Sequence, residues 1–304
     1  MKVGITGAAG LVGSTTAFYL AVQDLVEEIV LIDINEKLLL AHTWDMEQAV
    51  MDVSHTRITS GGLEALAGCG LVIHCASVNE SNAKSRDECL DQNCAILRSI
   101  AQAVAAWCPQ AILITAANPV DVLNYVFYRE TGFPRERVIG FSRNDTLRLR
   151  WAISKREGIP MESVDAISIG EHGFATVPLF SRILVDGRPH PYDSAAQEEI
   201  RGAIVNYYTN YQNLRTGRSS GWTTAVSLVQ VCRKILLDDP APVPCSVVLQ
   251  GEYQLEGLSL GVPVRLGSGG LREILEVPMD AGERAGFLAA AQKTKDHIRH
   301  LLGE

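Results

Sequence analysis

Two charged residues, Asp145 and Arg148, stand three positions apart in a segment that is expected to form a helix over residues 145–155. Side chains at positions i and i+3 of a helix lie on the same face, so both groups point to one place. A buried aspartate can fix the tautomer of a nearby imidazole and favour its protonated form, and a guanidinium can hold a carboxylate through two parallel hydrogen bonds. The alternative is a surface ion pair of the kind that any helix can carry.

His172 can supply the imidazole, because it follows a strand expected to end at Gly170 and stands between Glu171 and Gly173. A loop in this place can present the side chain to a cleft, where a histidine gives and takes protons near neutral pH. The chain has seven histidines, so one of them carries little weight alone, and a structural histidine is the competing interpretation. Its motif, Gly170-Glu171-His172-Gly173, is the reason to prefer the catalytic one.

A glycine-rich turn, residues 7–13, follows the apolar strand that opens the chain and leads into an apolar helical stretch. Glycines permit the tight turn and let backbone N–H groups approach a pyrophosphate, while the helix N-terminus favours its negative charge. A second apolar strand ends at Asp33, whose carboxylate can hydrogen-bond both ribose hydroxyls and would repel a 2′-phosphate. These features predict an NAD site, with NADP disfavoured, whose residues include Gly7, Gly10, Leu11, Val12, Gly13 and Asp33.

Four strand-like runs alternate with helical patterns in the first half of the chain, at residues 3–6, 29–33, 71–75 and 112–116. This alternation is typical of a parallel sheet with helices on both faces, and ligands gather at the carboxyl ends of its strands. Asn118 and the segment after Cys75 lie at such ends. Beyond about Gly140 the pattern changes to helices and further β-like segments. We therefore predict an α/β protein with an N-terminal Rossmann domain, a doubly wound parallel sheet, over 1–142 and a C-terminal α+β substrate domain over 143–304.

The last helix is expected to begin with Asp280 and Glu283 as a pair that resembles a capping box. One of its faces is largely apolar and predicts a contact with the core or with another subunit. The residues of this face are Phe287, Ala291, Thr294, Ile298 and Leu302.

Composition limits the classes of function. The 304 residues are 47% hydrophobic and carry 27 basic against 35 acidic side chains, a formal net charge of −8, which argues against a nucleic-acid partner. The sequence has no cleavable apolar leader and no run of 18 apolar residues, so we expect a cytoplasmic protein without a membrane partner. The cysteines lie mostly in or beside apolar runs and lack closely spaced Cys or His partners for zinc, so no metal is expected.

Four segments, in their order and spacing, resemble the lactate/malate dehydrogenase family, and the similarity extends over nearly the whole chain. They are residues 117–121 (Ala-Asn-Pro-Val-Asp), 137–140 (Arg-Val-Ile-Gly), 145–148 (Asp-Thr-Leu-Arg) and 170–173 (Gly-Glu-His-Gly). The resemblance implies hydride exchange between NAD(H) and a small-molecule 2-hydroxy or 2-oxo acid. It also implies a homodimer or homotetramer, with an acidic monomer as the alternative. Further cofactor contacts would come from Ala76, Ser77, Asn93 and Asn118.

The resemblance also implies individual functions for the charged residues. His172 would protonate the substrate carbonyl as hydride arrives and accept the proton in the reverse direction, with Asp145 as its carboxylate partner. Arg148 would bind the substrate carboxylate. Arg86 would polarise the carbonyl from a loop that closes over the substrate and expels water. Asn118 would orient the substrate as well as the nicotinamide ribose.

The chain departs from the family at the position that selects the substrate. Members selective for lactate usually carry glutamine there and members selective for malate carry arginine, whereas this chain has Glu80, six positions before Arg86. An acidic group would repel the second carboxylate of oxaloacetate, so malate is not the expected substrate. After His172, the usual Gly-Asp-Ser is replaced by residues 173–175, Gly-Phe-Ala, so one carboxylate of the pocket is gone. Thr223 matches a pocket-wall position of lactate dehydrogenases more closely than the Ser-Ala pair of malate dehydrogenases.

Three interpretations of Glu80 remain open. We prefer the first, in which Glu80 pairs with an amino, guanidino or other hydrogen-bond-donating tail of a 2-oxo acid while Phe174 packs on the aliphatic part of that tail. In the second, Glu80 replaces the carboxylate lost after His172, and the substrate is a small neutral 2-oxo acid. In the third, Glu80 faces solvent. A different class, a non-catalytic NAD-binding regulatory protein, is disfavoured because every proton-transfer and carboxylate-binding group is retained.

Overall fold

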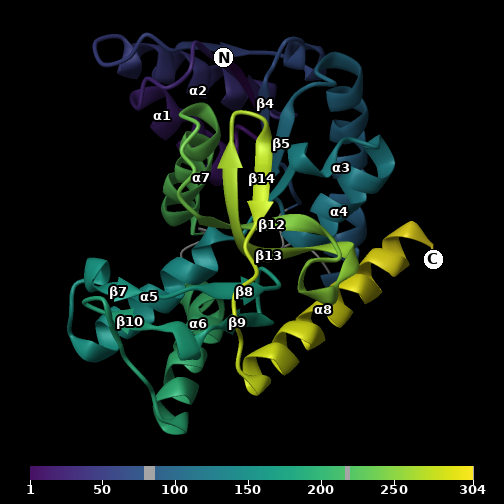
Figure 1. The fold of residues 1–304 in the computed structure, drawn as a ribbon. Coiled ribbons are helices and arrows are strands. Elements are labelled where there is room, and N and C mark those ends of the chain that lie inside the picture. The colour runs from purple at the N-terminus through teal and green to yellow at the C-terminus, as the bar shows by residue number, and fades with distance from the viewer. Residues whose placement is uncertain (79–85, 216–219, 304) are drawn as a thin grey trace.

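The structure, a computed structural model, describes residues 1–78, 86–215 and 220–303. Within these residues one sheet of eleven strands runs through the molecule (Figure 1). Its first six strands are parallel, in the order β3-β2-β1-β4-β5-β6, and most of their residues are buried, as expected for strands that helices cover on both faces. They are β1 (Lys2–Thr6), β2 (Glu28–Ile32), β3 (Arg57–Ser60), β4 (Leu71–His74), β5 (Ile112–Thr115) and β6 (Val138–Phe141).

Helices cover both faces of the parallel strands. On one face α1 packs against α7, and on the other α3 packs against α4 (Figure 1). This arrangement is the doubly wound α/β architecture predicted for the first half of the chain. The helices are α1 (Leu11–Val22), α2 (Glu36–Val50), α3 (Arg86–Trp107), α4 (Val120–Thr131) and α7 (Gly221–Leu236).

The C-terminal strands extend the same sheet in antiparallel fashion. Strand β6 pairs with β12, with Gly140 opposite Ser246, and the order continues through β13 and β8 to β9, with β14 beside β13. The sheet therefore contains strands from both sides of the predicted boundary at residue 142. The sequence pattern did not indicate this continuity. These strands are β8 (Ser168–Gly170), β9 (Thr176–Pro178), β12 (Val243–Gln250), β13 (Glu256–Gly267) and β14 (Gly270–Ile274).

A smaller lobe lies below the main sheet in Figure 1. It combines a three-stranded sheet with two helices that bury a separate apolar cluster, which includes Leu149, Ile153 and Ile200. Its elements are α5 (Arg143–Glu157), β7 (Val164–Asp165), β10 (Leu184–Val185), β11 (Arg188–Pro189) and α6 (Ser194–Asn213).

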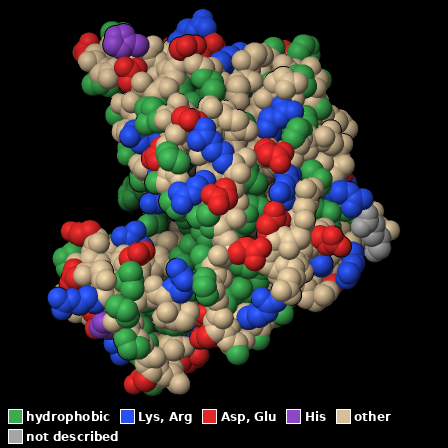
Figure 2. All heavy atoms as spheres, viewed as in Figure 1, with side chains coloured by type: hydrophobic (Ala, Val, Ile, Leu, Met, Phe, Trp, Pro, Cys, Tyr) green, Lys and Arg blue, Asp and Glu red, His purple; other side chains and the backbone are tan. Residues whose placement is uncertain are grey.

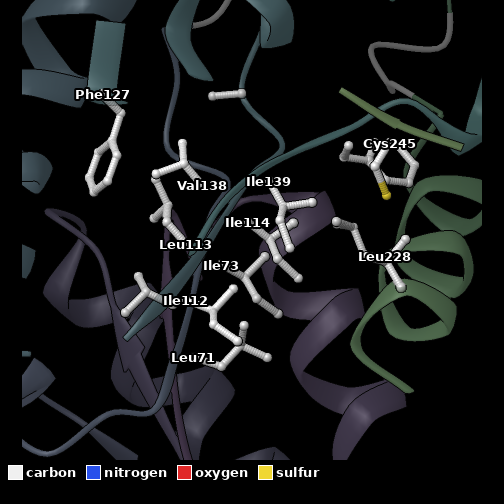
Figure 3. Close-up of a cluster of buried hydrophobic side chains, with 14 of the residues drawn as sticks. Leu71, Ile73, Ile112, Leu113, Ile114, Phe127, Val138, Ile139, Leu228 and Cys245 are labelled. Carbon is white, nitrogen blue, oxygen red and sulfur yellow. The ribbon is translucent and has the colours of Figure 1, made fainter. Parts of the chain in front are cut away.

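The main core fills the space between the central strands and their helices. Leu71 and Ile73 of β4, Ile114 of β5, Leu228 of α7 and Cys245 of β12 are all fully buried (Figure 3). Because α7 and β12 belong to the second half of the chain, both halves contribute side chains to one continuous core.

The last helix, α8 (Ala281–Leu302), begins as expected from the sequence. Asp280 accepts from the Glu283 N–H and the Glu283 carboxylate accepts from the Asp280 N–H, which completes a capping box. Phe287, Ala291 and Ile298 are buried against the main core, so the apolar face of α8 is a core contact.

The fold class predicted from the sequence is confirmed, with two strands added. In the first half of the chain the strands β3 and β6 were not predicted, although β6 overlaps the motif at residues 137–140. Within the described ranges no helix is both long and apolar enough to cross a membrane. The surface is hollowed between α7 and the smaller lobe, and hydrophobic side chains line this notch (Figure 2).

Candidate active site

Three residues from two elements meet at the centre of the site. His172 lies in the loop after β8, and its Nδ1 is 2.5 Å from Oδ2 of Asp145 in the first turn of α5. The other oxygen of Asp145 accepts from Nη1 of Arg148 at 3.2 Å. The side chains of His172 and Asp145 are only 10% and 4% exposed. The helix thus presents Asp145 and Arg148 on one face, and Asp145 contacts both the imidazole and the guanidinium.

The contact with Asp145 controls the charge and tautomer of the imidazole. Burial has the largest influence and lowers the pKa of His172, but the negative charge of Asp145 and its hydrogen bond together raise that pKa above its ordinary value. A carboxylate only accepts, so Nδ1 of His172 donates to Asp145. The exchangeable proton is therefore carried by Nε2, the nitrogen that remains for a substrate.

The loop that carries His172 is held by two carboxylates that the sequence analysis did not select. The backbone N–H of His172 donates to Oδ2 of Asp121 at 2.6 Å. Glu171 accepts from the backbone N–H of Ala175 at 2.9 Å and forms an ion pair with Lys293 of α8 at 2.6 Å. The sequence signal for Asp121 was an aspartate in the first turn of a mostly apolar helical segment, inside a motif already noted for its asparagine.

Aromatic side chains from α6 lie beside Arg148 and were also missed. The Arg148 guanidinium lies over the ring of Tyr207, with Cζ 5.2 Å from the ring centroid. Tyr207 stacks on Tyr211 and meets the edge of Trp151. A cation over an aromatic face is attracted by the ring quadrupole, so Tyr207 and Asp145 hold Arg148 from two directions.

The glycine turn after β1 forms the cradle expected for a dinucleotide. A Cβ on Gly7, whose φ is +75°, would meet the backbone of Ala76, and one on Gly13 would overlap the Gly7 carbonyl. The first-turn N–H groups of α1 have no acceptor within the helix and are left for a pyrophosphate. Asp33 reaches the same turn, because its Oδ2 accepts from the Ala9 N–H at 3.0 Å.

Asn93 joins the loops that follow β4 and β5. Its Oδ1 accepts from the Val78 N–H at 2.8 Å, and its Nδ2 donates to the Asn118 carbonyl at 2.8 Å. Both ends of the Asn93 amide thus make hydrogen bonds within the chain, whereas the side chain of Asn118 is exposed. The predicted cofactor residues Ala76 and Ser77 lie in the first of these loops, and Ser77 is exposed.

The remaining predicted site residues have different placements. Glu80 and the side chain of Arg86 lie outside the described residues, although Arg86 begins α3. Phe174, in the loop after His172, is 40% exposed. Thr223 is exposed near the start of α7, whereas its neighbour Thr224 is the residue that contacts α5, through a 2.9 Å hydrogen bond from Asn144. In the described part of the chain no cluster of three His, Cys, Asp or Glu side chains is placed to hold a metal ion.

We expect Asp145→Asn to lower the pKa of His172, because the substitution removes the charge that outweighs burial. An NMR titration of the imidazole in the free protein would measure the change. Asp165→Asn, which replaces an exposed carboxylate in β7, serves as the control and should leave the titration unchanged. An unchanged midpoint in Asp145→Asn would mean that Asp145 does not set the protonation of His172.

Known proteins match the whole length of this chain. Residues 1–140 match the family model described as lactate/malate dehydrogenase, NAD binding domain, and residues 143–303 match the model of the alpha/beta C-terminal domain of the same family. The malate dehydrogenase of Haloferax volcanii is 33% identical over 303 residues, which cover 99% of both chains. The L-lactate dehydrogenase of Clostridium perfringens is 31% identical and covers 98% of this chain and 96% of its own.

Solved structures share the fold at similar identity. The malate dehydrogenase from Salinibacter ruber superimposes with a TM-score of 0.91 at 30% identity, covering 100% of this chain and 98% of its own. Taken with the two family models, this likeness shows that the chain belongs to the lactate/malate dehydrogenase family and is an NAD-dependent oxidoreductase that acts on CH–OH donors.

Proposed function

We propose that this protein exchanges hydride between NAD(H) and a 2-hydroxy or 2-oxo acid, with His172 as the proton donor and acceptor. The buried contact between His172 and Asp145 carries the proposal, because it supplies an imidazole that is held in one tautomer and favoured in its protonated form. The cradle around Gly7 and Gly13 fits a dinucleotide, which supplies or accepts the hydride when bound.

The other steps, which are proton transfer, carboxylate binding, polarisation of the carbonyl and orientation of the substrate, fall to individual residues of the site. Nε2 of His172 gives its proton to the carbonyl oxygen of a 2-oxo acid and takes it back in the reverse direction. Arg148 binds the substrate carboxylate. Among the described residues its hydrogen bond to Asp145 occupies one of the five N–H donors of the fork, so others remain for a bidentate contact. Arg86 polarises the carbonyl, and Asn118 orients the substrate.

We further propose that Glu80 selects a 2-oxo acid with a cationic or hydrogen-bond-donating tail. Relatives of this chain are named for malate and for lactate, so their names do not decide between substrates. A carboxylate in the closed pocket costs free energy unless the substrate offers it a partner. The exposed ring of Phe174 supports the proposal, since it can pack on the aliphatic part of such a tail.

NAD should bind more tightly than NADP, by about tenfold or more, which corresponds to about 1.4 kcal/mol. Both oxygens of Asp33 accept backbone N–H groups, from Ala9 and Asn35, and each can still accept from a ribose hydroxyl. A 2′-phosphate would meet this carboxylate as a like charge. Calorimetric titration of the wild type and of Asp33→Ser would measure the preference, and equal affinities in the wild type would contradict it.

His172→Asn should retain NADH binding and lose about 10²–10⁴-fold in turnover, because a positioned proton donor is removed. Arg148→Gln should instead raise KM for the 2-oxo acid, since the bidentate contact is lost. Stopped-flow fluorescence for NADH binding and steady-state absorbance for turnover separate the two effects. Near-wild-type turnover in His172→Asn would refute the assignment of the proton donor.

Glu80 should decide which tail the enzyme accepts. The wild type should reduce a 2-oxo acid with an amino or guanidino tail best, pyruvate poorly and oxaloacetate worst. Glu80→Gln should raise activity on pyruvate and lower it on the cationic substrate, and Glu80→Arg should favour oxaloacetate. Initial rates of NADH oxidation across the three substrates would test this.

Glu47→Gln, which removes an exposed carboxylate from α2, serves as the control and should leave all three rates unchanged. Efficient reduction of pyruvate by the wild type, together with no effect of Glu80→Gln, would place Glu80 in solvent. Efficient reduction of pyruvate with a loss in Glu80→Gln would favour the second interpretation, in which Glu80 replaces a missing pocket charge.

A further inference from the structure

Asp121 is a buried carboxylate that contacts the backbone of the loop carrying His172. It lies in the first turn of α4 and is only 2% exposed. Its Oδ2 accepts the backbone N–H of His172 at 2.6 Å, and its Oδ1 accepts the hydroxyl of Ser246 in β12 at 2.5 Å. One carboxylate therefore connects α4, the sheet and the loop that carries the proton donor.

A polar network supports this carboxylate from the side of the sheet. The hydroxyl of Ser246 is 2.9 Å from that of Ser259 in β13, and Asn124, one turn further along α4, donates to Ser259 at 2.9 Å. The N-terminus of α4 adds a favourable dipole. Even so, burying a charge is costly, and a neutral asparagine could accept from the His172 N–H and donate to the Ser246 hydroxyl if holding the loop were the whole function.

We infer that Asp121 is a positioning residue for His172: it fixes the main chain of the catalytic loop and adds a second negative charge that favours the imidazolium. This inference rests on the proton transfer by His172 proposed above. His172 would then be held at two points, at Nδ1 by Asp145 and at its backbone N–H by Asp121. Neither contact uses Nε2, so the nitrogen that faces the substrate stays available.

The charged groups around the imidazole come from four elements. Asp145 and Arg148 face it from α5, and Asp121 faces it from α4. Glu171, the preceding residue, acts on Asp121 and is itself paired with Lys293 of α8. Among the contacts described for the neighbouring strands, the groups are uncharged: the ring of Phe141 from β6 lies 6.0 Å from the imidazole between centroids, and the hydroxyls of Ser246 and Ser259 lie on the side of Asp121.

Asp121 also shares its segment with the exposed amide of Asn118. The Asn118 carbonyl is bonded to Asn93, which in turn holds the N–H of Val78 in the loop after β4. Hydrogen bonds thus connect the loop after β4 to the start of α4, where Asp121 accepts the backbone N–H of His172. The position of the proton donor is thereby tied to the loops of the cofactor side.

Protonation of Asp121 gives the inference a measurable signature. Burial raises the pKa of Asp121 to about 6, against the lowering effect of the hydrogen bonds from Ser246 and His172. As the pH falls through this value the carboxylate is neutralised, and its charge and one of its acceptors are lost. Reduction of the 2-oxo acid should therefore decline below about pH 6, and also above the raised pKa of His172.

The free energy of unfolding should change with pH in the opposite direction to activity: it should be higher where Asp121 is protonated. A carboxyl group whose pKa is higher in the folded than in the unfolded state binds its proton more tightly when folded. The free energy of unfolding therefore falls as the pH rises from the ordinary value near 3.8 to about 6, and the full cost persists above that window. At pH 8 Asp121→Asn should remove this cost, so its Tm should equal or exceed that of the wild type.

The experiment compares Asp121→Asn with the wild type in pH profiles of kcat and kcat/KM and in an NMR titration of the His172 imidazole in the free protein. We expect kcat to fall by about tenfold, less than the loss caused by His172→Asn. The decline below pH 6 should disappear, and the pKa of His172 should move down. KM for the 2-oxo acid should change less than kcat, since Arg148 is untouched.

Glu283→Gln is the matched control, because Glu283 is a 3% exposed carboxylate that also accepts a backbone N–H, from Ser181, and its described partners are Ser181 and Asp280. It should alter Tm but neither the pH profile nor the titration of His172. If Asp121→Asn does not fold, Ser246→Ala replaces it. Loss of the Ser246 donor should raise the pKa of Asp121 and move the low-pH decline to higher pH.

A pH profile and a His172 titration that coincide with those of the wild type, in Asp121→Asn or in Ser246→Ala, would overturn the inference. His172→Asn is measured in the same series to separate a failure of this inference from a failure of the proposed function. If its turnover is near wild type, the proposed proton donor is wrong. If only His172→Asn loses activity, the proposed function stands and Asp121 has a purely structural function.

Discussion

The antiparallel pairing of β6 with β12 is the contact on which the site depends. Gly140 lies opposite Ser246, and a Cβ at residue 140 would meet the side chains of Ser246 and Val120, so the strands and α4 can approach this closely only at a glycine. This approach brings the Ser246 hydroxyl to Asp121. It also fixes the end of β6, from which α5 starts with Asp145 and Arg148 in its first two turns.

The resulting site is built by elements from both halves of the chain, and Asp121 of the first half holds the loop of the second half that carries His172. The first half supplies the glycine turn, the amide of Asn118 and the carboxylate of Asp121. The second half supplies His172, Asp145 and Arg148. The carboxylates of the site have different partners: Asp145 lies between His172 and Arg148, Glu171 is paired with Lys293, and Asp121 accepts hydrogen bonds from Ser246 and the His172 N–H.

The proposed function places proton transfer and carboxylate binding on one set of elements and the choice of substrate tail on another. The proposed proton donor and carboxylate-binding residue stand on α5 and on a loop that is hydrogen-bonded to α4. Glu80 lies outside the described residues, in the segment between the loop held by Asn93 and the start of α3. In the proposed function, Glu80 therefore acts from a different segment of the chain than His172, Asp145 and Arg148.

The sequence by itself indicated the fold class, the dinucleotide turn and the family, and it singled out His172, Asp145 and Arg148 as the residues of the proposed site, because each of these depends on local spacing. A strand followed by a glycine turn, an i,i+3 pair and a capping box at Asp280 are all specified within a few residues. Only the tertiary structure decided that the sheet is continuous, that Tyr207 lies against Arg148, and that Asp121 holds His172 across 51 positions of sequence. Such contacts depend on how distant elements pack, and no period or motif in the chain encodes which buried carboxylate meets which backbone N–H.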